Sequence, residues 1–251
     1  RGSRKIRTGV GGDGGGGKEM KLTSWQSLLD TPGFERLGDI TQAVEKGDFR
    51  ARADAVNDLT LLLVSQRQLC APRLGAFVDI YAARLGDANT KVATAALQGV
   101  ERLVPAYGSL GLDQTLGILV PALSANLSNS SLQIRNLASA NLEQLAATMD
   151  PVALLPPLTS ALDFGNPRAR SALAERLRAL LPGIAERKPQ LLHKHVVPSA
   201  LRLLEDHRAD VRAATNALVR DLHAALGGEG LLAAPRLGDR QKQRVREIIS
   251  S

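Results

Sequence analysis

The stretch DFRARADAVNDL (residues 48–59) decides the fold, because its pattern returns along the chain. It returns as DANTKVATAALQGV (87–100) and DHRADVRAATNAL (206–218), with looser copies at 129–135 and 166–170. Each copy opens with Asp, Asn or Gly-Asp, which cap helix N-termini or form the preceding turn, and then places Ala and Leu at helical spacing. Equivalent positions recur after 41, 42, 35 and 42 residues, counted at Arg52, Ala93, Arg135, Arg170 and Arg212.

A period near 40 residues with two helices per unit is typical of HEAT or armadillo-type solenoids. We therefore predict an all-α protein, an α-solenoid of five to six HEAT-like helix pairs. The low aromatic content, 3% against 44% hydrophobic residues, also favours helices over a β-sandwich. The first helices of the pairs are expected over roughly 32–46, 72–86, 112–128, 151–164 and 190–205.

Several chemical functions are excluded by the residues present. Cys70 is the single cysteine, which rules out an internal disulfide framework and a cysteine-based zinc site. His193 and His195 have no third ligand nearby in sequence, and no catalytic triad, paired carboxylates or nucleotide loop stands out. We predict a non-enzymatic protein without cofactor or metal, in a reducing, cytoplasmic compartment, and no apolar run is long enough to span a membrane.

The net charge of +7 is concentrated at the two ends of the chain. Residues 1–17 carry four basic residues against one acidic, and residues 236–251 carry five against two. We expect a flexible, Gly-rich, basic linker over 1–20, because glycines without apolar residues cannot offset their ordering entropy. The folded domain is expected over 21–251, with a short helix at 23–30, repeats at 32–235 and a capping helix at 237–250.

The body is almost neutral, yet each turn between the helices of a pair carries a cation in the turn or just after it. Lys91, Arg168 and Arg208 come early in their turns and are expected to face a partner. Arg170 and its equivalents Arg52 and Arg212 fit two roles equally, contact with a partner or an internal Asp–Arg ladder, as between Asp210 and Arg170. Phe49 lies between the charged residues Asp48 and Arg50 in a short turn. We therefore interpret it as an exposed anchor for a partner rather than as a core residue.

The repeat resembles TOG domains, with 48–59, 87–100 and 206–218 similar to the first, second and fifth turns and their following helices. The resemblance covers roughly 32–250 and implies a flat paddle that binds αβ-tubulin through these turns. An aromatic residue, usually Trp, contacts tubulin from the first turn, where this chain has Phe49. The implied tubulin-binding residues are Phe49, Arg50, Asn89, Lys91, Arg135, Arg168, Arg170, Arg208 and Arg212.

Two other readings stay open at this point. The chain could be a HEAT-repeat scaffold whose concave helix faces bind a non-tubulin protein, or a nucleic-acid binder that uses its basic ends. The resemblance instead implies a monomeric domain, one of several modules in a longer protein, at microtubules of the cytoskeleton or cilium. It implies no nucleic-acid or membrane partner.

Overall fold

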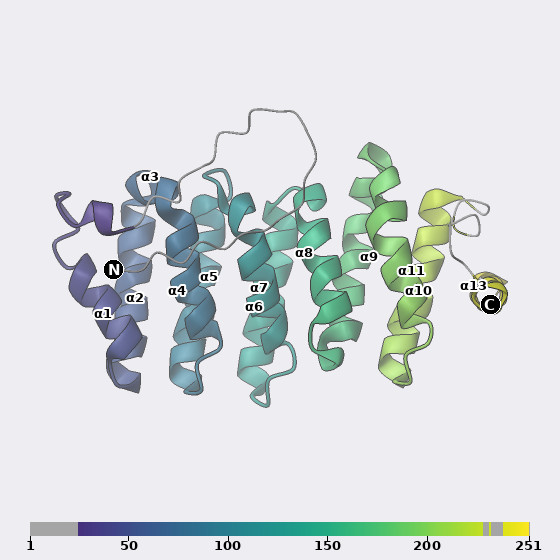
Figure 1. Cartoon of the computed structure of the whole chain (residues 1–251), viewed down its shortest axis with the longest axis horizontal. Coiled ribbons are helices and arrows are strands. Elements are labelled where there is room, and N and C mark those ends of the chain that lie inside the picture. The colour runs from purple at the N-terminus through teal and green to yellow at the C-terminus, as the bar shows by residue number, and fades with distance from the viewer. Residues whose placement is uncertain (1–24, 228–230, 232–237, 251) are drawn as a thin grey trace, which may run out of the picture.

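The computed structural model describes residues 25–227, Leu231 and 238–250, and the predicted linker over 1–20 lies outside them. Five antiparallel helix pairs follow one another along the chain (Figure 1), which confirms the predicted all-α solenoid. Their first helices are α1 (Leu37–Lys46), α4 (Leu74–Leu85), α6 (Leu116–Asn126), α8 (Pro151–Phe164) and α10 (Val197–Leu203). Their second helices are α2 (Phe49–Ser65), α5 (Thr90–Tyr107), α7 (Leu132–Thr148), α9 (Arg170–Arg187) and α11 (Ala209–Leu226).

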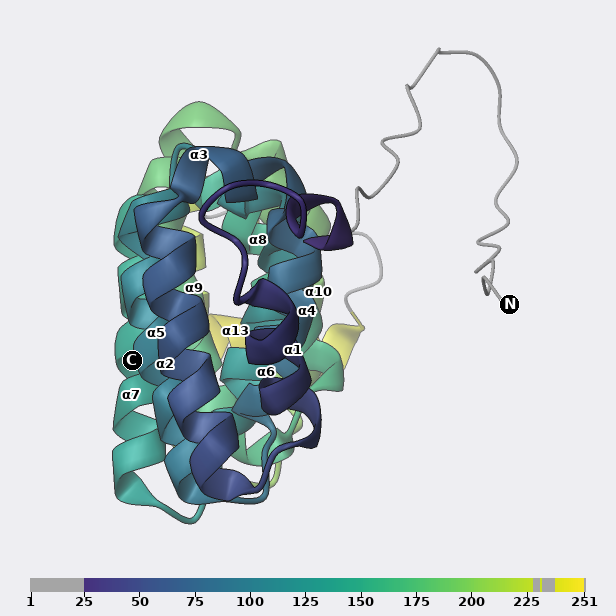
Figure 2. The same ribbon diagram turned by 90° about the vertical axis from the view of Figure 1, so that its left-hand side faces the viewer.

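The helices form two layers, which Figure 2 shows end-on. The first helices make one layer and the second helices the other, and each repeat packs against its neighbours. A single hydrophobic core built mainly from Leu, Val and Ala runs between the layers. Such stacking buries the apolar stripe that one helix pair alone would leave exposed.

Irregular turns of helix precede most of the first helices, so these α-helices begin later than the sequence predicts. A short helix α3 (Arg67–Cys70) and the 3₁₀ helix η2 (Ala71–Arg73) precede α4, and the 3₁₀ helix η3 (Leu112–Thr115) precedes α6. A π-helical segment, η5 (Leu192–Val196), precedes α10. Only α8 begins at its expected residue, Pro151.

Buried polar side chains link successive repeats. The Asn126 side-chain amide donates to the carbonyl of Leu85 at 3.0 Å, and the Asn141 amide donates to the carbonyl of Leu97 at 3.1 Å. The Tyr107 hydroxyl donates to the Leu63 carbonyl at 2.7 Å. Since buried polar groups need specific partners, these bonds fix how each repeat sits on the one before it.

The two ends of the solenoid are covered differently. At the N-terminal end a 3₁₀ helix, η1 (Trp25–Leu28), takes the place of the helix expected over 23–30. Leu28 is buried and Trp25 partly buried against the core, whereas Leu29 is 40% exposed. At the other end α13 (Asp239–Ser250) packs against α11 and buries Val245 and Ile248, as a capping helix should.

Candidate functional site

The five turns that join the helices within each pair line up along one edge of the solenoid, the lower edge in Figure 1. In every turn an Asp or Asn side chain accepts the backbone N–H two residues further on, at or just before the start of the second helix. These residues are Asp48, Asn89, Asn129, Asn166 and Asp206. These bonds hold the turns in place. The predicted capping role is confirmed for Asp48, whereas Asp206 forms the turn that precedes α11, whose N-cap is Arg208.

Two of the turns also require glycine. A Cβ atom at Gly47 would lie 2.6 Å from the carbonyl oxygen of Ala43, and one at Gly165 would lie 2.3 Å from that of Ala161. Both contacts are with backbone of the preceding helix, so neither can relax cheaply. The first and fourth turns therefore share one geometry, in which glycine ends the first helix and Asp or Asn begins the second.

Phe49 lies at the first position of α2, half-buried, with two cations against its ring. The Arg50 guanidinium is 5.6 Å from the ring centroid and the Lys91 ammonium is 5.8 Å from it. Lys91 belongs to the second turn, so the ring joins two repeats. Cations at this distance are attracted by the ring quadrupole. The structure thus brings together Phe49, Arg50 and Lys91, with Asn89 capping the helix that carries Lys91.

The arginines in the Arg52 register are engaged inside the domain. Arg52 donates to the carbonyl of Gly47 and to Asp87 of the next repeat, and Arg170 donates to Asp206 of the next repeat at 2.8 Å. Asp87 and Asp206 are almost fully buried. Of the two roles left open for this register, Arg52 and Arg170 form the ladder, although Arg170 pairs with Asp206 and not with Asp210, and Arg212 takes no part in it. The buried carboxylate loses water, but its bonds to a guanidinium compensate.

Arg135 and Arg212 turn back on their own turns. The Arg135 guanidinium donates to the carbonyls of Asn129 and Ser130 at 2.6 and 2.9 Å. The Arg212 guanidinium donates to the carbonyl of His207 and, at 3.4 Å, to that of Asp206. Both side chains are half-buried. These hydrogen bonds hold each turn in place, so fewer guanidinium donors are left for a partner.

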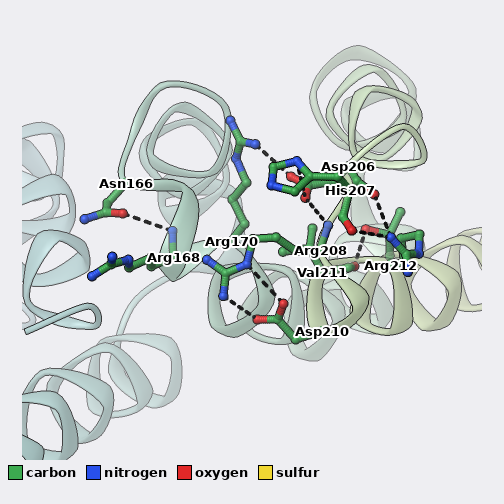
Figure 3. A network of polar contacts seen from close by, with 10 residues as sticks. Asn166, Arg168, Arg170, Asp206, His207, Arg208, Asp210, Val211 and Arg212 are labelled. Atoms are coloured by element: carbon green, nitrogen blue, oxygen red, sulfur yellow. Dashed lines mark hydrogen bonds and ion pairs between the residues drawn. The ribbon is translucent and has the colours of Figure 1, made fainter.

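The fifth turn carries a cation that is already paired, as Figure 3 shows. The Arg208 guanidinium forms two hydrogen bonds to Asp210, at 3.1 and 2.9 Å, and Asp210 also accepts from the Ser171 hydroxyl at 3.2 Å. The Arg208 hydrogen bonds are the largest factor that lowers the pKa of Asp210. Arg208 therefore presents a partly neutralised charge.

Arg168 in the fourth turn is different, because its guanidinium is exposed and makes no hydrogen bond or ion pair with any residue that the structure describes. Two apolar residues that the sequence analysis did not single out lie on the same edge. Phe164 ends α8 and is 81% exposed, and Leu132 begins α7 and is 61% exposed. Leu132 occupies the first helical position, as Phe49 does, a signal that alignment of the repeats could have revealed.

Other candidate sites are poorly supported. Among the described residues no group of three or more His, Cys, Asp and Glu could hold a metal ion. Burial raises the pKa of the Cys70 thiol to about 11, which makes a reactive thiolate unfavourable. Within the same residues no helix is both long and apolar enough to cross a membrane.

The stacked helix pairs and the edge of short turns are those of the TOG-domain fold. The resemblance predicted from the repeats is therefore confirmed. It aligns with a TOG domain of Caenorhabditis elegans Zyg9 at a TM-score of 0.68 and 19% identity, covering 93% of this chain and 92% of that one. A chain solved for "TOG-tubulin binding specificity promotes microtubule dynamics and mitotic spindle formation" aligns at 0.66 and 17% identity, covering 90% and 85%.

Particular relatives emerge from sequence. The chain is 25% identical over 225 residues to human "TOG array regulator of axonemal microtubules protein 1", covering 86% of this chain and 13% of that protein. It is 27% identical over 184 residues to the Caenorhabditis elegans "Crescerin-like protein che-12", covering 68% of this chain and 14% of that protein. No protein-family model matches the chain. The chain thus spans a small part of these relatives' length.

Proposed function

We propose that this chain is a non-enzymatic tubulin-binding domain that engages αβ-tubulin through its edge of turns and so regulates microtubule dynamics. The observation that carries the proposal is the cluster of Phe49, Arg50 and Lys91 on a rigid, exposed edge. The TOG-domain fold and the names of the sequence relatives, which refer to microtubules, support the same partner.

The physical basis is complementarity between a fixed row of cations and an acidic protein surface. The caps hold the turns before any partner arrives, so little ordering entropy is lost on binding. The cations increase the rate and specificity of association, while an aromatic ring supplies the kind of anchor that dominates interface energies. Because the row is rigid, it fits one curvature of tubulin better than another and shifts the population toward that state.

We rank the proposed contact residues by how free their side chains are. Phe49, Arg50, Lys91 and Arg168 have side chains available to a partner, with Asn89 positioned beside Lys91. Arg208 contributes after partial neutralisation by Asp210. Arg135, Arg170 and Arg212 act mainly by holding the turns in place, and reach the partner with the donors that remain.

The surrounding protein belongs to the proposal as well. We infer a monomeric domain that works as one of several modules in a longer protein at cytoskeletal or ciliary microtubules, with neither nucleic acid nor membrane as partner. Linked modules would raise the overall avidity through effective concentration.

The test is co-migration of the purified domain with αβ-tubulin on size exclusion at low and moderate salt. The wild-type chain should co-migrate, and Lys91→Glu combined with Arg50→Glu should weaken binding by about 100-fold, because it reverses two charges at the aromatic anchor. The matched control is Lys194→Glu, an exposed lysine in η5 at the opposite edge.

Two results would contradict the proposal. If wild-type protein fails to bind tubulin at low salt, tubulin is not the partner of this domain. If the double variant binds as well as wild type, tubulin is bound elsewhere, for example on the concave helix faces of a general HEAT-repeat scaffold.

A further inference from the structure

The outer surface of helices α6 and α8 is almost uncharged. α6 (LGILVPALSAN) contains no charged residue, and α8 (PVALLPPLTSALDF) contains only Asp163, which pairs with Arg202 on α10. Apart from Asp163, the half-buried or exposed positions of these two helices are occupied by small, aliphatic, proline and aromatic residues. The exposed ones are Gly117, Ile118, Pro121, Ala125, Pro156, Ser160 and Phe164.

This surface, which we call the α6–α8 face, is hollowed beside the fourth turn. A shallow depression of about 180 Å³ lies between the two helices. Its lining comes from Pro121, Ser124 and Ala125 on α6, from Ser160, Ala161 and Phe164 on α8, and from Gly165 and Asn166 in the turn. The depression therefore opens next to the edge of turns.

Phe164 stands at the corner where this face meets the edge. Its side chain is the most exposed of the large apolar residues that the structure describes, at 81%. No cation lies over its ring among the described residues, unlike Phe49. Exposed apolar surface grouped around an aromatic residue is typical of a site where another protein binds.

We propose that the α6–α8 face, with Phe164 as its anchor, is a second contact surface for the same acidic partner that the edge of turns binds, αβ-tubulin. The inference rests on the proposed function and extends its interface. Phe164, Asn166 and Arg168 belong to one turn, so a partner that reaches the free Arg168 also covers Phe164. The partner surface that fits is acidic opposite the turns and uncharged and apolar opposite α6 and α8.

The test is the affinity of the whole chain for tubulin, measured by isothermal titration calorimetry. Phe164→Ala should weaken binding by about 10-fold, as expected for loss of an aromatic anchor, and Phe164→Leu should have a smaller effect. Leu69→Ala is the control, because Leu69 is 45% exposed on α3 at the opposite edge. Ser160→Glu adds a charge at an exposed position that lines the depression, and should weaken binding without removing any apolar contact.

Salt separates this surface from the row of cations. The loss caused by Phe164→Ala should be nearly the same at low and moderate salt, whereas the loss caused by charge reversal at Lys91 should shrink as salt screens it. Phe164→Ala and Ser160→Glu binding like wild type, with the Lys91 variant impaired, would overturn this inference and leave the proposed function standing. Wild-type chain that does not bind tubulin would remove the proposed function itself.

A second copy of the chain is the competing occupant of this face. Sedimentation velocity of the wild-type domain over a range of concentrations decides this point. A monomer is expected throughout. A concentration-dependent dimer that Phe164→Ala abolishes would overturn the inference, because the face would then be a self-association surface.

Discussion

The first and fourth turns have the same backbone plan but present their aromatic residues differently. In each, glycine ends the first helix against a backbone carbonyl, and Asp48 or Asn166 caps the second. Phe49 follows its glycine and lies under two cations, whereas Phe164 precedes its glycine and is bare. The ring that follows the glycine is thus held by cations of two repeats, whereas the ring that precedes the glycine is left exposed.

The neighbouring turn completes the difference. The second turn sends Lys91 across to Phe49. In the fifth turn Asp210 occupies the position equivalent to Lys91, and it holds the guanidinium of Arg208, the N-cap of α11, with two hydrogen bonds. The first two turns thus form an organised aromatic–cation cluster, whereas the fourth turn has an arginine unpaired among the described residues and an exposed ring, and the fifth has an arginine paired with Asp210.

The shared glycines offer the largest expected effect. Gly165→Ala should lower the free energy of unfolding by about 3 kcal/mol and Gly47→Ala by about 2 kcal/mol, because the new Cβ meets a carbonyl oxygen and the backbone must shift. Urea denaturation followed by circular dichroism measures both, with Gly117→Ala as a control, since nothing lies within 4 Å of a Cβ there. Equal stability of Gly165→Ala and wild type would show that the two turns do not share this constraint.

The ladder pairs behind the two turns come next. Arg170→Ala should cost about 2 kcal/mol of stability, since it leaves the buried Asp206 without its guanidinium; the figure is reduced from that of a fully buried pair because Arg170 is partly exposed. Arg52→Ala should cost less, about 1 kcal/mol, because Arg84 also pairs with Asp87, at 3.4 Å. The affinity of the folded variants for tubulin should change little. A large loss of affinity at unchanged stability would assign these arginines to the partner instead.

The same pair predicts a pH dependence. Burial raises the pKa of the Asp206 carboxyl. The hydrogen bonds from the backbone N–H of Arg208 and from the Arg170 guanidinium together lower this pKa by more than burial raises it, so the net shift is downward. A lowered folded-state pKa contributes stability above the unfolded pKa of about 3.9, and this is lost as pH falls through the folded value. Unfolding measured from pH 6 down to pH 2 should show a shallower acid loss in Arg170→Ala than in wild type. Identical acid slopes would contradict the role of this pair.

The sequence alone predicts the helix pairs and the edge of turns, but not the state of individual side chains on that edge. The period near 40, the caps and the glycines are local signals, so the helix pairs and the edge of turns were predictable from Asp48 to Arg212. The exposure of Phe164 was not, because its position at the end of α8 reads as part of a core helix until the packing of α6 against α8 is known. Nor could the sequence decide that Arg170 pairs with Asp206 and Arg208 with Asp210, since both carboxylates lie within reach along the chain.

The free and the paired cation should differ in their effect on binding. Arg168→Ala should weaken tubulin binding by about 5-fold and Arg208→Ala by about 2-fold, because Asp210 already neutralises part of the Arg208 charge. Asp210→Ala should strengthen binding slightly by releasing Arg208. Competition measured by fluorescence anisotropy at fixed salt compares the three variants, and a larger loss for Arg208→Ala would mean that the ion pair opens on binding.

The smallest effect is expected at the aromatic ring of the first turn. Phe49→Trp should strengthen tubulin binding by about 2-fold to 3-fold, because the indole gives a stronger cation–π interaction with Arg50 and Lys91 and adds an N–H donor. The same change at position 164 should have no cationic component, since no cation among the described residues lies over that ring. The two gains are compared by calorimetry at low and moderate salt: the gain at position 49 should decline with salt, and an equal, salt-independent gain at both positions would mean that the cations flanking Phe49 do not tune its contact.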